Sequence, residues 1–317
     1  MRPHSHNSSE RVYLLSIVIP VFRDAIRAIE LVRTLQGQRL PSGFEIEIIV
    51  VDDGSNDGSA NRIKAVVGKD ITLLRLSKNS GRAIARNNGA AAARGETLLF
   101  MDCDCLPVSD DLIIEHMRAW AADVVATIGP VVGNGDGFWH RYQVTASERR
   151  ARQHASGINF SGSSQNLMVK RTAFDACGGF DSNYCTYGFE DRDLQIRIAR
   201  YGRIVWATTA SVRHMDSLAL PLVCRKMIEA GGAAAVLFSH HHPEAYRVLG
   251  YAHLDARQHA WLRPLARLLD HLIEPMARYS DLIIASRCLP YKPKSWLVKA
   301  LIGLSYLVGT ARPTHLI

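Results

Sequence analysis

The sequence predicts an α/β protein in which a mainly parallel, Rossmann-like sheet carries helices on both faces and is followed by a helical C-terminal region. Short apolar runs alternate with amphipathic segments from about residue 14 onward, which is typical of β-α-β units. Beyond about residue 217 the apolar residues follow helical spacing. A chain of 317 residues with 47% hydrophobic content can bury the core that such a fold requires.

Four apolar runs are predicted to be the buried strands of the sheet: residues 14–20, 45–51, 71–76 and 96–101. Asp24 begins the helix after the first run, and Asp57 or Ser59 caps the helix after the second. The alanine-rich stretch after the third run favours a helix that ends at Gly95. In sheets of this kind, ligands bind beyond the carboxyl ends of the strands.

The charge balance favours an anionic partner. The formal net charge of +8 attracts nucleotide phosphates, acidic lipids or nucleic acid. The basic residues are spread along the chain without an aromatic-rich platform, so nucleic-acid binding is not expected. Six cysteines without paired spacing favour reduced thiols, and the polar N-terminus lacks the apolar core of a signal peptide. We therefore expect a cytoplasmic protein.

Paired acids follow two of the predicted strands. Asp52 and Asp53 come after the second strand, and Asp102 and Asp104 come after the fourth. A lone Asp at such a place is an ordinary turn residue. Two acidic pairs at one edge of a sheet favour instead Mg²⁺ or Mn²⁺ bridging a diphosphate, since these cations prefer oxygen ligands.

Two arginines and a second acidic group are further candidates. Arg82 and Arg86 lie four residues apart on one helical face, so both can point at a diphosphate, and a solvated face is an equally good interpretation. Glu190 and Asp191 begin a predicted helix, where capping alone explains acids. His214 follows a predicted strand, and a lone histidine is more often a packing residue.

Five motifs, in this order along residues 14–216, resemble those of family 2 glycosyltransferases, which are inverting, sugar-nucleotide-dependent enzymes of the GT-A fold. They are SIVIPVF, IIVVDDGSNDGS, GRAIARNNGAAAARGETLLFMDCD, GGFDSNYCTYGFEDRDLQIRIARYG and VRH. GGFD and GFED also resemble a C-terminal motif of galactosyl- and N-acetylgalactosaminyltransferases. The resemblance implies transfer of a sugar from a nucleotide diphosphate, expected to be UDP, to a glycan, a lipid-linked or another hydroxyl acceptor.

The resemblance also implies a metal site. MDCD matches the family's DxD motif, in which Asp104 binds Mn²⁺ or Mg²⁺ directly. Asp102 then faces the ribose of the sugar nucleotide or a water of the metal. His214 matches a third metal ligand. Cys105 stands where the family often has a further acid, so a role for a third carboxylate at that position is not expected.

The sugar nucleotide is expected to contact several other residues by the same resemblance. Asp52 matches the acid that recognises the base, and Pro20 and Val21 match the loop that flanks it. Asn166 lies in a segment similar to the one that lines the donor-sugar pocket. Arg82 and Arg86 are expected at the diphosphate.

The catalytic residues are expected at Glu190 and Asp191, because FED resembles the acidic motif that supplies the family's general base. An inverting transfer needs a carboxylate opposite the departing diphosphate to take the proton of the acceptor hydroxyl. We assign Asp191 as the base and Glu190 to sugar hydroxyls. The two roles remain interchangeable at this point, because both acids share one turn.

The resemblance divides the chain into a loose leader, two halves of a catalytic domain and a helical region. These are residues 1–13, the nucleotide-binding half at 14–105, the acceptor and catalytic half at 106–216, and 217–317. A nucleotidyltransferase or a non-catalytic sugar-nucleotide-binding scaffold is the alternative. The first should not need the FED base and the VRH ligand, and the second predicts loss of the catalytic acids.

The C-terminal region leaves the question of membrane contact open. Residues 296–309 are apolar but shorter than the roughly 18 residues that span a bilayer, and they include Lys299. Residues 261–283 place one helical stripe beside arginines, and its members are Leu262, Leu265, Leu269, Leu272, Ile273 and Met276. A helix packed on the rest of the protein is favoured. The alternative is an amphipathic surface that lies peripherally on the inner face of an anionic membrane.

Overall fold

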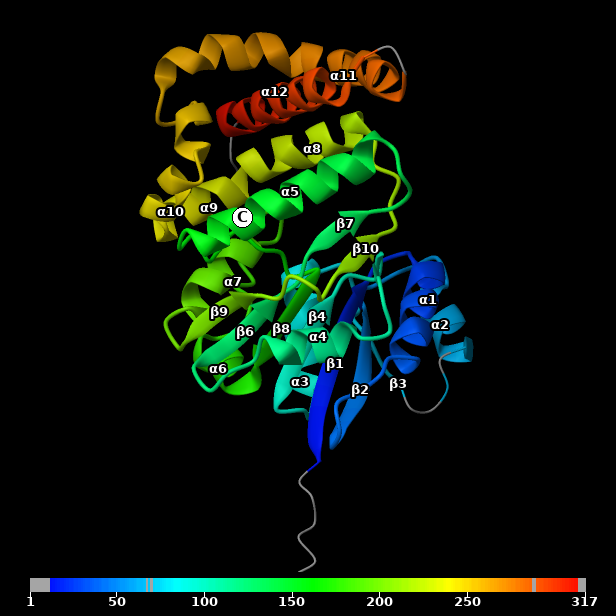
Figure 1. The fold of residues 1–317 in the computed structure, drawn as a ribbon. Coiled ribbons are helices and arrows are strands. Elements are labelled where there is room, and N and C mark those ends of the chain that lie inside the picture. Colours follow the sequence, from blue (N-terminus) through cyan, green and yellow to red (C-terminus); the bar gives the residue numbers. More distant parts are fainter. Residues whose placement is uncertain (1–11, 67, 69–70, 287–288, 313–317) are drawn as a thin grey trace, which may run out of the picture.

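The computed structural model describes residues 12–66, 68, 71–286 and 289–312, and its core is a seven-stranded sheet (Figure 1). In sheet order the strands are β3 (Ile71–Arg75), β2 (Phe44–Asp52), β1 (Tyr13–Val21), β4 (Thr97–Met101), β8 (Asn166–Lys170), β6 (Val124–Ile128) and β9 (Arg203–Trp206). β8 runs antiparallel to β4 and β6, while the other neighbouring pairs are parallel. The four predicted strands β1 to β4 are confirmed within two residues at each end.

Helices cover both faces of this sheet, as the alternation of side chains along the strands requires. Ile17 and Ile19 of β1 belong to one apolar cluster, and Val18 belongs to the other. The first cluster holds residues of α1 (Ala25–Gln36), α2 (Ser59–Val66) and α4 (Leu112–Arg118). The second holds residues of α3 (Arg82–Ala92), α6 (Arg171–Ala176) and α7 (Glu190–Ile198).

A second, three-stranded sheet joins parts of the chain that are distant in sequence. Its order is β5 (Cys105–Pro107), β10 (Val212–His214) and β7 (Val131–Gly133). β10 pairs antiparallel with β5, and His214 is opposite Cys105 in that register. This pairing brings His214 beside Asp104.

The remaining helices form a layer beyond the sheets, at the top of Figure 1. They are α5 (Phe138–Ala155), α8 (Leu220–Gly231), α9 (Ala233–His241), α10 (Pro243–Val248), the short 3₁₀ helices η1 (Tyr251–Leu254) and η2 (Ala260–Leu262), α11 (Arg263–Ala285) and α12 (Tyr291–Ala311). α12 packs against both α8 and α11. Three aromatic residues near the start of α5, Phe138, Trp139 and Tyr142, pack against the same apolar cluster.

The packing of α12 explains the apolar stretch at residues 296–309. Val298, Leu301, Leu307 and Val308 are buried in the helical layer, so most of the stretch is core. Within the described ranges, every helix is too short or too polar to cross a membrane.

The predicted single stripe of α11 divides between two faces of the helix. Leu269 and Ile273 are buried against the other C-terminal helices. Leu265, Leu272 and Met276 are exposed, because they lie on a neighbouring face of the helix. α11 therefore has one apolar face in the core and a second apolar band at the surface.

Two predictions concern regions at the limits of the described chain. Residues 1–11 of the predicted leader lie outside the described residues, and β1 already begins at Tyr13. The five described cysteines are free thiols, as predicted, while Cys288 lies outside the described residues.

A buried histidine connects α4 to two central strands. His116 Nδ1 lies 2.8 Å from Thr127 Oγ1 on β6, and its Nε2 lies 2.8 Å from Asn166 Oδ1 on β8. Asn166 also donates from its side chain to the carbonyl oxygen of Ala210 at 2.7 Å. Burial lowers the pKa of His116 to about 4, because no carboxylate is available to stabilise the imidazolium.

This histidine should make the fold sensitive to acid. In the unfolded state the imidazole takes up a proton below its ordinary pKa of 6.5, whereas in the folded state it stays neutral until about pH 4. The free energy of unfolding should therefore fall as the pH is lowered through that window. Between pH 7 and pH 5 the contribution is about 2 kcal/mol. Urea unfolding of His116→Gln should show an acid-induced loss smaller by that amount.

The control is His253→Gln, which replaces an exposed histidine of η1. It should lose as much stability between pH 7 and pH 5 as the wild type. Equal acid sensitivity of His116→Gln and the wild type would contradict the buried neutral histidine.

Candidate functional site

A cavity of about 910 Å³ lies between the carboxyl edge of the sheet and the helical layer. Its walls come from the ends of β1 and β4, the start of α7, and helices α5, α8 and α12. Pro20 and Val21 line it, as predicted. The cavity also includes Asp102, Asp104 and His214, so acids from one half of the chain face residues from the other half.

Asp104, His214 and Asp216 form a group in which one donor atom of each lies within 4.8 Å of the others. His214 Nε2 is 3.4 Å from Asp104 Oδ2. Burial opposes ionisation of Asp104, but the hydrogen bond with His214 lowers its pKa to about 2. Two carboxylates and an imidazole are a donor set that can hold Mn²⁺ or Mg²⁺.

Asp216 is a member of this group that the sequence reasoning missed. The available signal was its spacing, because it stands two residues after His214 on the segment that leaves β10. Asp216 also forms an ion pair with Arg27 of α1. That ion pair gives the segment after β10 a second attachment to the nucleotide-binding half.

Asp102 takes a different position from its partner in the DxD motif. Its Oδ1 accepts a hydrogen bond of 2.6 Å from Arg86 Nη2, and it lies outside the three-residue donor group. Because Asp102 still lines the cavity, contact with the ribose remains open to it. This arrangement does not favour direct metal ligation by Asp102.

Arg86 is buried among carboxylates, whereas the sequence suggested a position at the diphosphate. Its side chain is 1% exposed, and its Nη1 lies 3.7 Å from both Glu190 Oε1 and Asp191 Oδ1. Arg82 lines the cavity, with its Nε 3.6 Å from Glu190 Oε1. Of the two arginines, Arg82 is the one that a ligand can reach.

The turn before α7 sets the position of the two candidate catalytic acids. Gly188 and Phe189 both have positive φ, of 105° and 69°, and the second value is unusual for a bulky residue. The Phe189 ring is held by stacking on Phe238, with centroids 4.8 Å apart. Packing of this ring stabilises a strained backbone that turns Glu190 and Asp191 toward the cavity.

Glu190 and Asp191 have different surroundings. The Glu190 side chain is 3% exposed, and burial together with the charge of Asp191 raises its pKa. The Asp191 side chain is 21% exposed, and its Oδ2 accepts a hydrogen bond of 3.3 Å from Ser163 Oγ. The environment therefore favours the neutral form of Glu190 and leaves Asp191 more accessible.

Besides Arg86, two predicted contacts of the sugar nucleotide do not line the cavity. Asp52 is fully buried, with Oδ1 accepting a hydrogen bond of 3.3 Å from Ser55 N. Asp53 lines the cavity at this strand end, and its carboxylate accepts hydrogen bonds from the backbone of Ser80 and Gly81. Asn166 is also fully buried, because its side chain is bound within the His116 network.

The chain matches the family model of glycosyl transferase family 2 over residues 16–180. It belongs to this family. A second family model, described as the N-terminal domain of galactosyltransferase, matches residues 147–218, which include the start of α7.

Two curated relatives each match less than half of the chain. Undecaprenyl-phosphate 4-deoxy-4-formamido-L-arabinose transferase of Pseudomonas aeruginosa (strain LESB58) is 31% identical over 134 residues, which are 41% of this chain and 39% of that protein. The uncharacterized glycosyltransferase YfnE of Bacillus subtilis (strain 168) is 33% identical over 141 residues, 44% of this chain and 33% of YfnE. The match thus spans less than half of either relative.

A solved structure with a similar fold is the mannosyltransferase PcManGT from Pyrobaculum calidifontis in complex with GDP-Man and Mn²⁺. The two chains superpose with a TM-score of 0.59 over 96% of this chain and 87% of PcManGT, at 17% identity. The GT-A fold predicted from the sequence is confirmed.

Proposed function

We propose that the chain is a metal-dependent, inverting glycosyltransferase that moves a sugar from a nucleotide diphosphate to an acceptor hydroxyl. The observation that carries the proposal is that one cavity contains both the group of Asp104, His214 and Asp216 and the acid pair Glu190 and Asp191. The first suits a divalent cation, and the second suits a general base.

The residues present fit a divalent cation. Asp104 and His214 are largely buried, and the buried Nδ1 of His214 lacks a hydrogen-bond partner among the described residues. Bound there, Mn²⁺ or Mg²⁺ would offset the negative charge that grows on the leaving diphosphate. The complex of PcManGT with GDP-Man and Mn²⁺ supports this assignment for the family fold.

Asp191 is the proposed base. The acceptor hydroxyl oxygen forms a bond to the anomeric carbon while the bond from that carbon to the diphosphate breaks, and the bonding electrons leave with the diphosphate. The acceptor proton passes to Asp191, whose charge is stabilised by Arg86, with Nη1 at 3.7 Å. Glu190, with its raised pKa, then donates to or accepts from a sugar hydroxyl.

The donor is proposed to be a UDP-sugar, which the match to a galactosyltransferase domain supports. Its nucleotide would lie by Pro20, Val21 and Asp53, where the cavity meets the ends of β1 and β2. The acceptor would enter from the helical layer. The undecaprenyl-phosphate transferase activity of the P. aeruginosa relative supports a lipid-linked acceptor over a free glycan.

Removal of one carboxylate from the donor group should abolish metal-dependent binding of the nucleotide. We expect Asp104→Asn and Asp216→Asn each to weaken binding of UDP in the presence of Mn²⁺ by about tenfold or more, measured by isothermal titration calorimetry. The control is Asp123→Asn, which removes a carboxylate that is 61% exposed and paired with Arg203. Unchanged Mn²⁺-dependent affinity in both site variants would refute the metal site.

The two acids of α7 should respond differently to amide substitution. Asp191→Asn should lower kcat by on the order of a thousandfold without changing the donor affinity, because the base is lost. Glu190→Gln should stay within about tenfold of the wild type, because a neutral amide resembles the protonated acid. The opposite order of the two kcat values would move the base to Glu190.

We also propose that the helical layer rests on an anionic bilayer. The support is the second apolar face of α11 with its neighbours on η2 and α12, here named the apolar band. Its members are 39% to 76% exposed: Trp261, Leu265, Leu268, Leu272, Met276, Tyr279, Leu282 and Trp296. Tryptophan and tyrosine favour the membrane interface, and the net charge of +8 favours anionic lipids.

Co-sedimentation with vesicles tests this contact. The wild type should bind phosphatidylglycerol-containing vesicles more strongly than phosphatidylcholine vesicles. Leu268→Ser/Leu282→Ser should weaken binding by roughly tenfold or more, because two apolar side chains are removed from the lipid. The control is Ile26→Ser, at an exposed position of α1. If the wild type is dimeric and does not bind vesicles, the apolar band would be assigned to a subunit interface instead.

A further inference from the structure

Six cations that line the cavity form no ion pair with a carboxylate among the described residues, and besides Arg152 and Lys299 there are four others. They are Arg149 and Arg150 of α5, Arg192 of α7 and Lys226 of α8, and we name them the cation cluster. Among the described residues, none of the four forms an ion pair with a carboxylate. The cation cluster is separate from the donor group at Asp104, whose charged neighbours are His214 and Arg27.

Arg149 is exposed, but the other three members of the cluster are partly buried, and they differ from other buried or partly buried arginines of the chain. Arg86 is bonded to Asp102, Arg197 to Asp193 and Arg257 to Asp255. Each of these cations is compensated by a neighbouring carboxylate, as buried charges generally are. The cation cluster has no such compensation.

Repulsion between the like charges of the cluster adds to the energetic cost of their partial removal from water. Burial and the charges of Arg192 and Arg149 lower the pKa of Arg150. The guanidinium of Arg192 lies 5.7 Å from the Phe189 ring centre and 5.6 Å from that of Tyr251, and its buried Nε has no hydrogen-bond partner among the described residues. A bound anion would relieve both the repulsion and the unsatisfied donor.

Tyr187 lies close to both the cation cluster and the candidate catalytic acids. Lys226 Nζ lies 5.5 Å from the centre of the Tyr187 ring. Glu190, Asp191 and Arg150 all interact electrostatically with the Tyr187 hydroxyl, so this side chain lies near both the acids and the cluster. The cluster thus lies next to the proposed base, on the side of the helical layer.

We propose that the cation cluster is an anion subsite that binds a phosphate ester carried by the acceptor and holds it beside Asp191. The inference rests on the proposed function, because it assigns this ester to the acceptor of that reaction. Guanidinium groups bind phosphate through paired hydrogen bonds, and several cations suit a dianion better than a single carboxylate. No covalent step is added to the transfer already described.

The wall beside the cluster is apolar. Leu222, Val223 and Met227 share α8 with Lys226 and line the same cavity, and Ile302 of α12 lines it as well. A phosphate ester with an apolar organic part would contact these side chains, whereas a sugar phosphate would use the cation cluster alone. The two sources of the phosphate can be separated experimentally.

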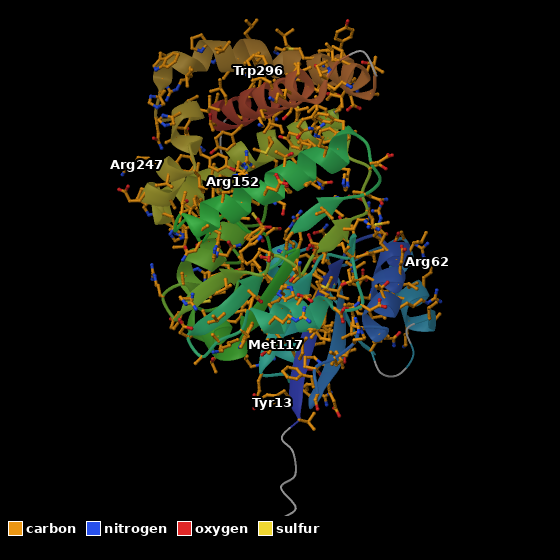
Figure 2. The ribbon with its side chains drawn as sticks, viewed as in Figure 1. Tyr13, Arg62, Met117, Arg152, Arg247 and Trp296 are labelled. Atoms are coloured by element: carbon orange, nitrogen blue, oxygen red, sulfur yellow. The ribbon has the colours of Figure 1, made fainter. Side chains whose placement is uncertain are left out.

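The test compares two variants that remove the same number of charges. Arg149→Gln/Arg150→Gln removes two members of the cation cluster. Arg62→Gln/Arg247→Gln removes two exposed arginines that lie on opposite outer surfaces in Figure 2 and line no part of the cavity. Lys226→Gln is a milder third variant in case the first does not fold.

Thermal unfolding is measured for each protein with geranyl phosphate, glucose 6-phosphate, glucuronate or sodium chloride at matched ionic strength, and UDP affinity with Mn²⁺ is measured in parallel. Phosphate esters should raise the melting temperature of the wild type and the surface variant above the chloride value, but not that of the cluster variants. A larger rise with geranyl phosphate would assign the ester to a lipid. Without ligand, Arg149→Gln/Arg150→Gln should be at least as stable as the wild type, because repulsion is relieved.

UDP affinity with Mn²⁺ should stay within about twofold of the wild type in all variants, since the cluster lies away from the donor group. Loss of UDP affinity in the cluster variants would overturn the proposal, because it would show that the cluster binds the diphosphate of the donor. Stabilisation by glucuronate but by neither phosphate ester would also overturn it. If UDP binds and no phosphate ester stabilises the wild type, the subsite fails and the proposed function stands. If a phosphate ester stabilises the wild type but UDP does not bind, the subsite stands and the proposed function fails.

Discussion

The site depends on one buried guanidinium. Arg86 is almost completely removed from solvent and lies within 3.7 Å of carboxylates from the end of β4 and from the start of α7. Without this cation, Asp102, Glu190 and Asp191 would be three acids in one desolvated place, and mutual repulsion would separate the two halves of the domain. The helix of the nucleotide-binding half therefore fixes the position of the acids that the second half supplies.

The charges that line the cavity differ between its two ends. Toward the ends of β4 and β10, carboxylates outnumber cations, and the surplus at Asp104 and Asp216 suits a metal ion. Toward α5 and α8, cations have no acidic partner among the described residues. A donor that arrives with its metal and an acceptor that carries an anion would therefore be directed to opposite ends, with Asp191 between them.

The sequence predicted those parts of the fold and site that depend on local pattern. β1, β2 and β4 are largely buried, so their apolar runs could be recognised, and acids at strand ends lie at one edge in any parallel sheet. The position of Asn166 depends on its contact with His116, from a helix about 50 residues earlier, which no local pattern reveals. Asp216 joins Asp104 only because β10 pairs with β5. The chemical roles of these residues remain predictions.

The helical layer connects the surface of the molecule to the chemistry. α8 presents Lys226 to the cavity and packs against α12, and α12 in turn packs against α11, whose outer face carries most of the apolar band. Because α12 packs against both α8 and α11, the three helices form one packed layer. An acceptor anchored in a bilayer would have to pass its phosphate beyond this layer to reach the cation cluster. The spacing of three packed helices would then set the length of acceptor that the enzyme accepts.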